Sequence, residues 1–395
     1  MVYTNYNSSF PDQVVPDAVK NSYEYGLQVA QAIENEWFNQ DYSGDRYLQN
    51  FQNFHRLRLY ARGEQPIQKY KDELSINGDL SYLNLDWKIV PILPKFVDII
   101  VNGMTDKGYE IKSFATDPFA TKERTEFAFR ALRDIINREY IEKLNEATGQ
   151  NFFSTAQPDQ LPASKDELDL YLQLNYKQAI EVAEEETINN VFDYNKYDET
   201  KRRIAYDLAV LGIGASKTNF NLSEGVTLDY VDPASMVYSY TEDPNFNDIY
   251  YVGEVKNLTI SEVKRLYPEL TDSDLKEIQK YKGPASYTNY VRNYGGQDDY
   301  NLIPVLFFEY KTYTNQVFKV KRTDQGLEKT IEKDDTFNPP ENDNFERVSR
   351  SIEVLYTGAK VLGMSKVIRW QLSENMTRPY GDVTKVNMNY SICAP

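Results

Sequence analysis

Few residues in this chain of 395 have the types and spacing that catalysis or metal binding requires. The three consecutive carboxylates Glu184–Glu186 could be metal ligands, but adjacent residues of a helix point in different directions, which favours a solvated helix face. Gly212 and Gly214 lack the third glycine of a dinucleotide-binding loop, and a predicted helix rather than a strand precedes them. A helix end followed by a turn is the better interpretation. We therefore predict no metal site and no cofactor.

The chain has one histidine and one cysteine, His55 and Cys393. A Ser-His-Asp triad or a histidine metal site would have to be built around His55 alone, so a structural or surface role is favoured. Cys393 has no basic partner nearby in the sequence to activate its thiol, which favours a small core residue. The residues present predict that the protein is not an enzyme.

The main basic cluster contains Arg56, Arg58 and Arg62, with Lys69 and Lys71 further on. One interpretation is contact with a phosphate backbone or with an acidic neighbouring subunit. The other is a solvated face that is balanced by the many carboxylates of the chain. The residues alone leave both interpretations open.

Composition narrows the class of protein. The formal net charge is -16, which argues against a general nucleic-acid binder. Residues 300–380 are nearly neutral, with 12 Lys+Arg and 11 Asp+Glu, so the acidic excess lies before them. The 32 tyrosines favour large interaction surfaces, because tyrosine combines an apolar ring with a polar tip. No apolar run approaches the roughly 20 residues of a membrane span.

Periodicity predicts the elements that would position these groups. Apolar residues at helical spacing predict helices over 17–38, 47–62, 121–147 and 165–193. Alternation predicts a short strand over 109–114.

The stretch 198–240 is predicted to be a helix, a glycine turn and a β-hairpin. The structural turn residues are Gly212 and Gly214 at the hairpin entrance and Asp232 and Pro233 at its exit. Two short helices follow, with capping boxes at Thr259 and Thr271, and 283–299 is a turn-rich linker. Strands are then predicted over 303–313, 317–323, 351–356 and 366–372. The fold class is α+β.

The order of these elements resembles the portal proteins of tailed bacteriophages, most closely those of crAss-like phages. The resemblance is carried, in this order, by Tyr60–Pro66, Ile89–Gly103, Ala205–Gly214, Gly225–Pro233 and Ser261–Pro268. Each segment is weak by itself, and their joint order over about residues 50–270 is the specific feature.

The resemblance implies a portal-like fold: a mainly helical wing with β-hairpins and a small β-rich clip-like domain. By position, 1–16 would be an N-terminal arm, 17–255 the wing-like α/β domain and 256–299 the helical stem approach and linker. Residues 300–375 would be the clip-like domain, and 376–395 the start of a missing or following stem or wing segment. Portal proteins continue past the clip, whereas this sequence ends at Pro395.

The implied function is structural, without enzymatic activity. A portal is a ring, of twelve subunits in the family, at one capsid vertex of the virion, and it assembles in the host cytoplasm. It is the channel for genome packaging and ejection, with double-stranded DNA passing through without sequence specificity. The implied partners are the major capsid protein, the large terminase during packaging, and neck, adaptor or tail proteins afterwards. No membrane is involved.

Two further expectations follow from this placement. Lys319, Lys321 and Arg322 in the clip-like region are the candidate contacts for a docking partner, and Arg56, Arg58 and Arg62 are candidate contacts for DNA or a neighbouring subunit. An acidic channel wall would repel phosphates and let DNA slide. The alternatives are another neck or adaptor scaffold of a virion, or a metal-dependent nucleic-acid enzyme.

Overall fold

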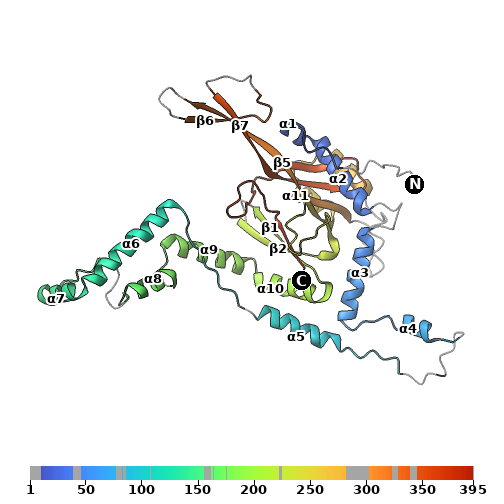
Figure 1. The fold of residues 1–395 in the computed structure, drawn as a ribbon. Coiled ribbons are helices and arrows are strands. Elements are labelled where there is room, and N and C mark those ends of the chain that lie inside the picture. The colour runs from blue at the N-terminus through green and yellow to red at the C-terminus, as the bar shows by residue number, and fades with distance from the viewer. Residues whose placement is uncertain are drawn as a thin grey trace. The chain divides into compact units, whose positions relative to one another are not determined.

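The computed structural model of this protein describes residues 10–38, 46–76, 82, 86–106, 108–154, 162, 164–174, 176–221, 225–281, 302–322, 328–338 and 345–394. The chain forms two compact units (Figure 1): Met1–Asp106 together with Asp198–Pro395, and Lys107–Tyr197. The predicted α+β class is confirmed, because helices fill much of the N-terminal half and two antiparallel sheets lie mainly in the C-terminal half.

Two antiparallel sheets form the centre of the first unit. The larger has the order β3-β4-β5-β7-β8, with β6 paired to β5, and the smaller has the order β2-β1-β9. The strands of the larger sheet are β3 (Met236–Tyr238), β4 (Tyr251–Leu258), β5 (Ile303–Arg322), β6 (Glu328–Lys333), β7 (Phe345–Val361) and β8 (Val367–Leu372). Those of the smaller are β1 (Gly214–Asn221), β2 (Gly225–Val231) and β9 (Tyr390–Cys393).

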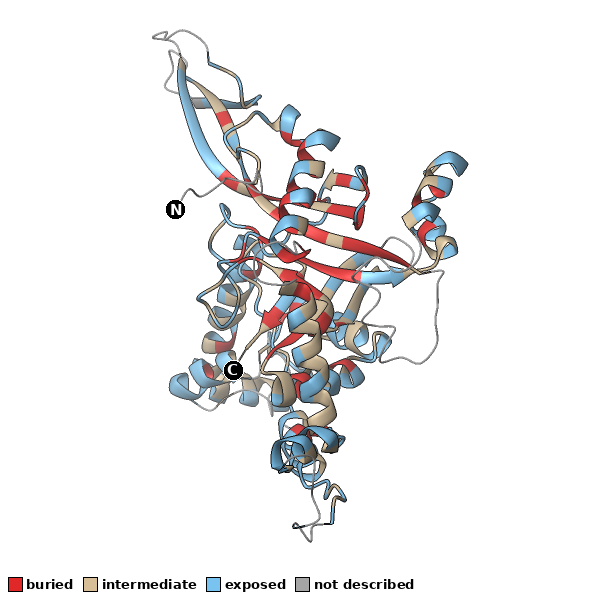
Figure 2. Cartoon of the chain, turned by 90° about the vertical axis from the view of Figure 1, so that its right-hand side faces the viewer, coloured by how far each residue is buried: buried red, intermediate tan, exposed pale blue. Residues whose placement is uncertain are grey.

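The long strands β5 and β7 are both core strands and an extended ribbon. They pair without interruption from Val305 and Val361 to Lys321 and Phe345. Up to Tyr310 and Tyr356 the two strands lie between β4 and β8. Beyond Tyr310, β6 is the only further strand of this ladder within the residues that the structure describes. Beyond Tyr310, β6 and the far end of β7 are largely exposed, whereas β5 is mostly half-buried, with Thr312 and Val317 buried (Figure 2).

The first unit also contains α-helices. They are α1 (Asp17–Lys20), α2 (Tyr23–Phe38), α3 (Arg46–Ala61), α4 (Ile67–Leu74), α5 (Leu93–Thr105), most of α10 (Tyr197–Leu211), α11 (Ile260–Leu266) and α12 (Asp272–Ile278). Helix α2 packs most closely on the larger sheet. A Cβ built on Gly26 would lie 2.4 Å from the Trp370 ring, so this glycine allows the helix to approach β8. Trp37 Nε1 donates a hydrogen bond to the buried Tyr251 hydroxyl (2.9 Å).

The second unit, described by itself, is helical: α6 (Pro118–Ile136), α7 (Arg138–Thr148), α8 (Lys165–Leu174) and α9 (Ala179–Tyr194). Asp117 caps α6 by accepting hydrogen bonds from the backbone of Phe119 and Ala120. The ring of Phe127 on α6 stacks on Tyr176, with centroids 4.3 Å apart.

Three local predictions are wrong in this unit. The helix predicted over 121–147 is two helices, because Asn137 leaves the helical conformation (φ -94°, ψ 11°) while the apolar spacing continues across it. The helix predicted over 165–193 is likewise divided, and Gln178 begins α9 with a capping box. The segment 109–114 is not a strand.

The other element predictions agree better with the structure. The capping boxes at Thr259 and Thr271 are present. The strands predicted over 303–313 and 317–323 are one continuous strand, β5. The predicted clip-like region 300–375 shares its sheet with β4 of the predicted wing-like region, because β5 pairs with the whole of β4. The predicted linker 283–299 lies outside the described residues.

The glycine turn after α10 uses two different properties of glycine. Gly212 has a φ of +74°, which L side chains rarely adopt. Gly214 is needed for space, because a Cβ there would lie 2.8 Å from Ile204 Cγ2 and 3.1 Å from Leu208 Cγ. The first strand of the hairpin can therefore leave directly along α10.

We expect Gly214→Val to lower the free energy of unfolding by about 1–3 kcal/mol, because it overpacks the contact with α10. Chemical denaturation monitored by circular dichroism measures this change. Gly108→Val is the control, since a Cβ at Gly108 meets no atom within 4 Å. Equal stability of the two variants would contradict the close packing at Gly214.

Candidate functional site

Arg58 on α3 is the centre of a partly buried charge cluster. Its Nη2 donates to Asp232 Oδ1 (2.7 Å) and to Asp207 Oδ1 (3.0 Å), and its Nη1 donates to Asp232 Oδ2 (3.0 Å). The Tyr230 hydroxyl donates a further hydrogen bond to Asp207. One guanidinium therefore joins α3, α10 and the exit of the β1–β2 hairpin.

The cluster explains the Val-Asp-Pro pattern of the sequence. Asp232 also accepts a hydrogen bond from the Ala234 backbone (3.0 Å), and Pro233 begins a 3₁₀ turn. Burial disfavours the charge of Arg58, but its hydrogen bonds and the charges of Asp232 and Asp207 outweigh this and raise its pKa. Arg58 thus uses its charge within the chain rather than presenting it to an external anion.

The three candidate contact arginines lie in different surroundings. Arg56 is exposed and donates to Asn53 Oδ1 (3.1 Å) on its own helix. Arg58 and Arg62 line a groove of about 520 Å³. Arg202 and Arg203 of α10 line the same groove, as do the carboxylates Asp98, Glu199 and Asp207, so its charges are mixed. The structure therefore brings Arg58 and Arg62 together but not Arg56.

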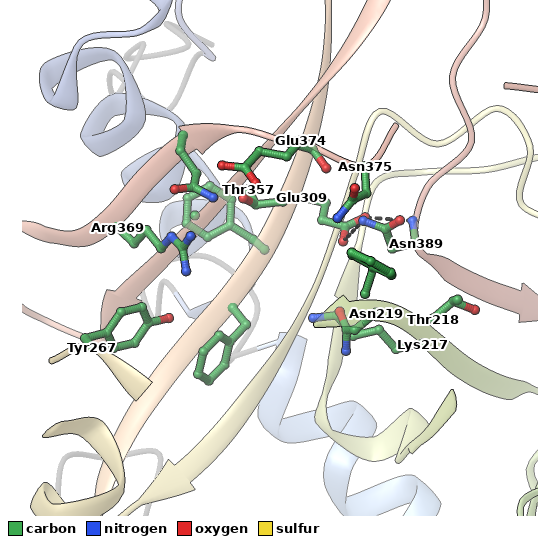
Figure 3. A pocket seen from close by; sticks show the side chains of 16 residues that line it. Lys217, Thr218, Asn219, Tyr267, Glu309, Thr357, Arg369, Glu374, Asn375 and Asn389 are labelled. Carbon is green, nitrogen blue, oxygen red and sulfur yellow. Dashed lines mark hydrogen bonds between the residues drawn. The ribbon is translucent and has the colours of Figure 1, made fainter. Parts of the chain in front are cut away.

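A polar cavity of about 290 Å³ lies between the two sheets (Figure 3). Within it Glu309 of β5 accepts hydrogen bonds from the backbone (2.9 Å) and the side-chain amide (3.0 Å) of Asn389. Figure 3 shows Lys217 and Asn219 of β1 on the same side as Asn389, with Arg369 across the cavity. Glu309 thereby ties the segment before β9 to the larger sheet.

Behind this cavity, Lys217 extends into a buried network. Its Nζ donates to the Tyr390 hydroxyl (2.8 Å) and lies 3.6 Å from Glu254 Oε1, to which Tyr390 donates in turn (3.1 Å). Burial lowers the pKa of Lys217 and raises that of Glu309. Both groups are hydrogen-bonded to protein partners, which supports a role in joining the sheets.

Two carboxylates of α9 accept hydrogen bonds from the backbone of the segment before α6. Glu181, which is buried, accepts from the Ala115 backbone (2.9 Å), and Glu185 accepts from the Ser113 backbone (2.9 Å). Carboxylate oxygens thus accept the backbone hydrogen bonds that the carbonyls of a neighbouring strand would otherwise accept. This explains why the segment 109–114 is extended but does not pair in a sheet. The described residues contain no group of three His, Cys, Asp or Glu that could hold a metal ion.

The far part of the β5–β7 ribbon contains the candidate docking residues. Lys319 and Lys321 lie on one face of β5, and the side chain of Arg322 lies outside the described residues. Register adds Arg347, which is opposite Lys319, and Lys329, which is opposite Lys321. Neither residue was a predicted contact, because no strand was predicted over 328–333 or over the first residues of β7. None of the described helices is long and apolar enough to cross a bilayer.

Arg58→Met is expected to destabilise the protein by about 3 kcal/mol, because it leaves the buried carboxylate of Asp207 without its cation. Arg56→Met is the matched control, and we expect a change within about 0.5 kcal/mol there. Denaturant titration of both variants measures the difference. Adding Asp207→Asn to Arg58→Met should recover part of the loss, and no recovery would contradict the charge cluster.

In comparisons with known proteins, no family model and no curated protein matches this chain, so its function is inferred from its own sequence and structure.

Proposed function

We propose that the chain is a portal protein, one subunit of a ring at a capsid vertex through which the phage genome is packaged and ejected. Two kinds of observation support this proposal. The first is the order of elements that resembles portal proteins, from α3 through α5 and α10 to the β1–β2 hairpin. The second, which carries the proposal, is an apolar helix face left open to solvent.

Helix α5 presents this face. Among its residues only Val101 is buried, at 3% exposure. Five large apolar side chains of the helix are between 43% and 57% exposed: Leu93, Phe96, Ile99, Ile100 and Met104. Val90 and Ile92 continue the apolar surface before the helix.

Such a contiguous apolar surface is typical of a protein interaction site rather than of a monomer surface. In a closed ring each subunit meets its neighbour through two different patches, so an unpaired apolar helix on one subunit needs no identical helix opposite. The proposal therefore assigns α5 to the contact with the next copy of the chain. The capsid protein, the large terminase and neck or tail proteins are the further partners of the proposed ring.

The test is the mass and shape of the assembled protein. Native mass spectrometry and negative-stain microscopy are expected to give a ring of about a dozen subunits with a central hole. A compact monomer that has Mg²⁺-dependent nuclease activity would contradict the proposal and favour a nucleic-acid enzyme instead.

The contact assigned to α5 can be tested separately by mutation. Phe96→Glu with Ile100→Glu should weaken assembly at least ~30-fold, since buried aromatic and aliphatic anchors are worth about 2 kcal/mol or more at interfaces. Lys95→Glu on the same helix changes the net charge equally and lies at an exposed polar position. Dissociation measured by mass photometry should separate the two variants. Complete rings from the double variant would show that α5 faces solvent in the assembly.

A further inference from the structure

The register of the distal ribbon assigns its side chains to two faces. Directly opposite residues of antiparallel strands lie on the same face of a sheet. Lys319 pairs with Arg347 of β7 and Ile331 of β6, and Lys321 pairs with Phe345 and Lys329. Val317 pairs with Ser349 and Lys333, which completes one face of three strands.

This face, called the basic ribbon face below, has five cations: Lys319, Lys321, Lys329, Lys333 and Arg347. No Asp or Glu occupies any of its nine paired positions. None of the five cations forms an ion pair with another described residue. The opposite face differs, because Glu332 and Glu346 lie on it beside Arg350.

Aromatic rings underlie two of the cations. Lys319 Nζ lies 4.0 Å from the centre of the Phe345 ring, and Lys333 Nζ lies 5.9 Å from that of Phe337. Arg347 Nε donates to the Phe337 carbonyl (2.8 Å). These contacts position two ammonium groups over ring faces and one guanidinium at a carbonyl, and none of these partners carries a formal negative charge.

We propose that the basic ribbon face binds the phosphodiester backbone of nucleic acid. Lysine is depleted in protein–protein interfaces, whose centres are apolar, whereas protein–nucleic acid interfaces are strongly positive and most of their contacts go to phosphates. The basic ribbon face has the positive composition of a protein–nucleic acid interface. Four of the cations are one ladder step apart: Lys321 is about 7 Å from Lys319 along β5, and Arg347 and Lys329 are each about 5 Å from their partners across the strands. Lys333 lies one diagonal step from Lys319. This spacing suits a row of phosphate charges.

The acidic remainder of the chain does not prevent this binding. At physiological salt, charges separated by more than about 8 Å of solvent are largely screened. Beyond Tyr310 the ladder continues with β7 and β6 alone, so the positive face is presented on an extended ribbon (Figure 1). Phosphate binding by this face does not require a ring. Only the identity of its natural ligand as double-stranded DNA rests on the proposed function.

The test is fluorescence anisotropy of the full chain with a labelled 30-base-pair duplex of mixed sequence, and with a single strand of the same length. Salt is varied from 50 to 200 mM. The variant Lys319→Gln, Lys321→Gln, Lys329→Gln should weaken binding at least tenfold at 50 mM salt. It should also reduce the salt dependence of log K by about three, one unit for each lost phosphate contact.

The matched control is Lys122→Gln, Lys143→Gln, Lys165→Gln, which removes the same charge from exposed positions of α6, α7 and α8. Its salt dependence should equal that of the unmodified protein. An equal effect of both triple variants, or of neither, would overturn the proposal. Thermal unfolding of each variant checks that the fold is retained.

Poly-glutamate of matched charge is the competing probe. If it displaces the duplex as effectively as unlabelled DNA does, the face is a dock for an acidic protein, and the proposal is wrong. Native mass spectrometry on the same samples separates this inference from the proposed function. A monomer that binds DNA through the ribbon would contradict the ring alone, and a ring without ribbon-dependent binding would contradict the inference alone.

Discussion

The uninterrupted pairing of β5 with β7 is the constraint on which the first unit depends. Seventeen residue pairs, from Val305 to Lys321 on β5, join the two strands. At roughly 3.3 Å per residue the ladder is about 55 Å long. Its near part carries the core side chains Leu306, Phe308 and Tyr310, and its far part carries the basic ribbon face. A shift of one residue would exchange the faces in both parts at once, so the buried core also specifies which side chains the ribbon presents.

The base of the ribbon is fixed where the core ends. Lys20, which is buried, donates from its ammonium group to the Tyr313 carbonyl, and Asp17 accepts from the Thr314 hydroxyl. The Asp17 backbone donates to Asp335 after β6 (3.0 Å). The short helix α1 therefore holds β5 and the segment after β6 at the point where β4 and β8 no longer pair with the ladder. Polar contacts therefore help to fix the direction in which the ribbon leaves the sheet.

The sequence predicted the parts of this fold that depend on local chemistry. Capping boxes at Thr259 and Thr271 use residues three apart, and their geometry is independent of the rest of the chain. The turn at Asn137 was missed because the apolar period continues across it. The role of Arg58 was also inaccessible, since its partners Asp207 and Asp232 lie 149 and 174 residues away in the chain. Of the basic ribbon face, Lys319 and Lys321 were candidates because the resemblance placed them in a clip-like region, and the remaining cations required the strand register.

The cations inside the fold form ion pairs with described residues, whereas those of the basic ribbon face do not, and this difference indicates what the ribbon face binds. Where the chain needs a charge for its own structure, it provides a partner: Arg58 has two aspartates, Lys217 has Glu254, and the buried Lys360 has Glu34. Moving a cation out of water without such a partner would cost several kcal/mol, so these pairs are requirements of folding. The ribbon lysines need no such partner for folding, because their ammonium groups remain hydrated. A protein of net charge -16 has many carboxylates that could neutralise the five cations of the basic ribbon face, yet the paired positions of that face contain none. On the two proposals made above, a phosphodiester backbone supplies the anion that complements this face, and the next copy of the chain covers the apolar surface of α5.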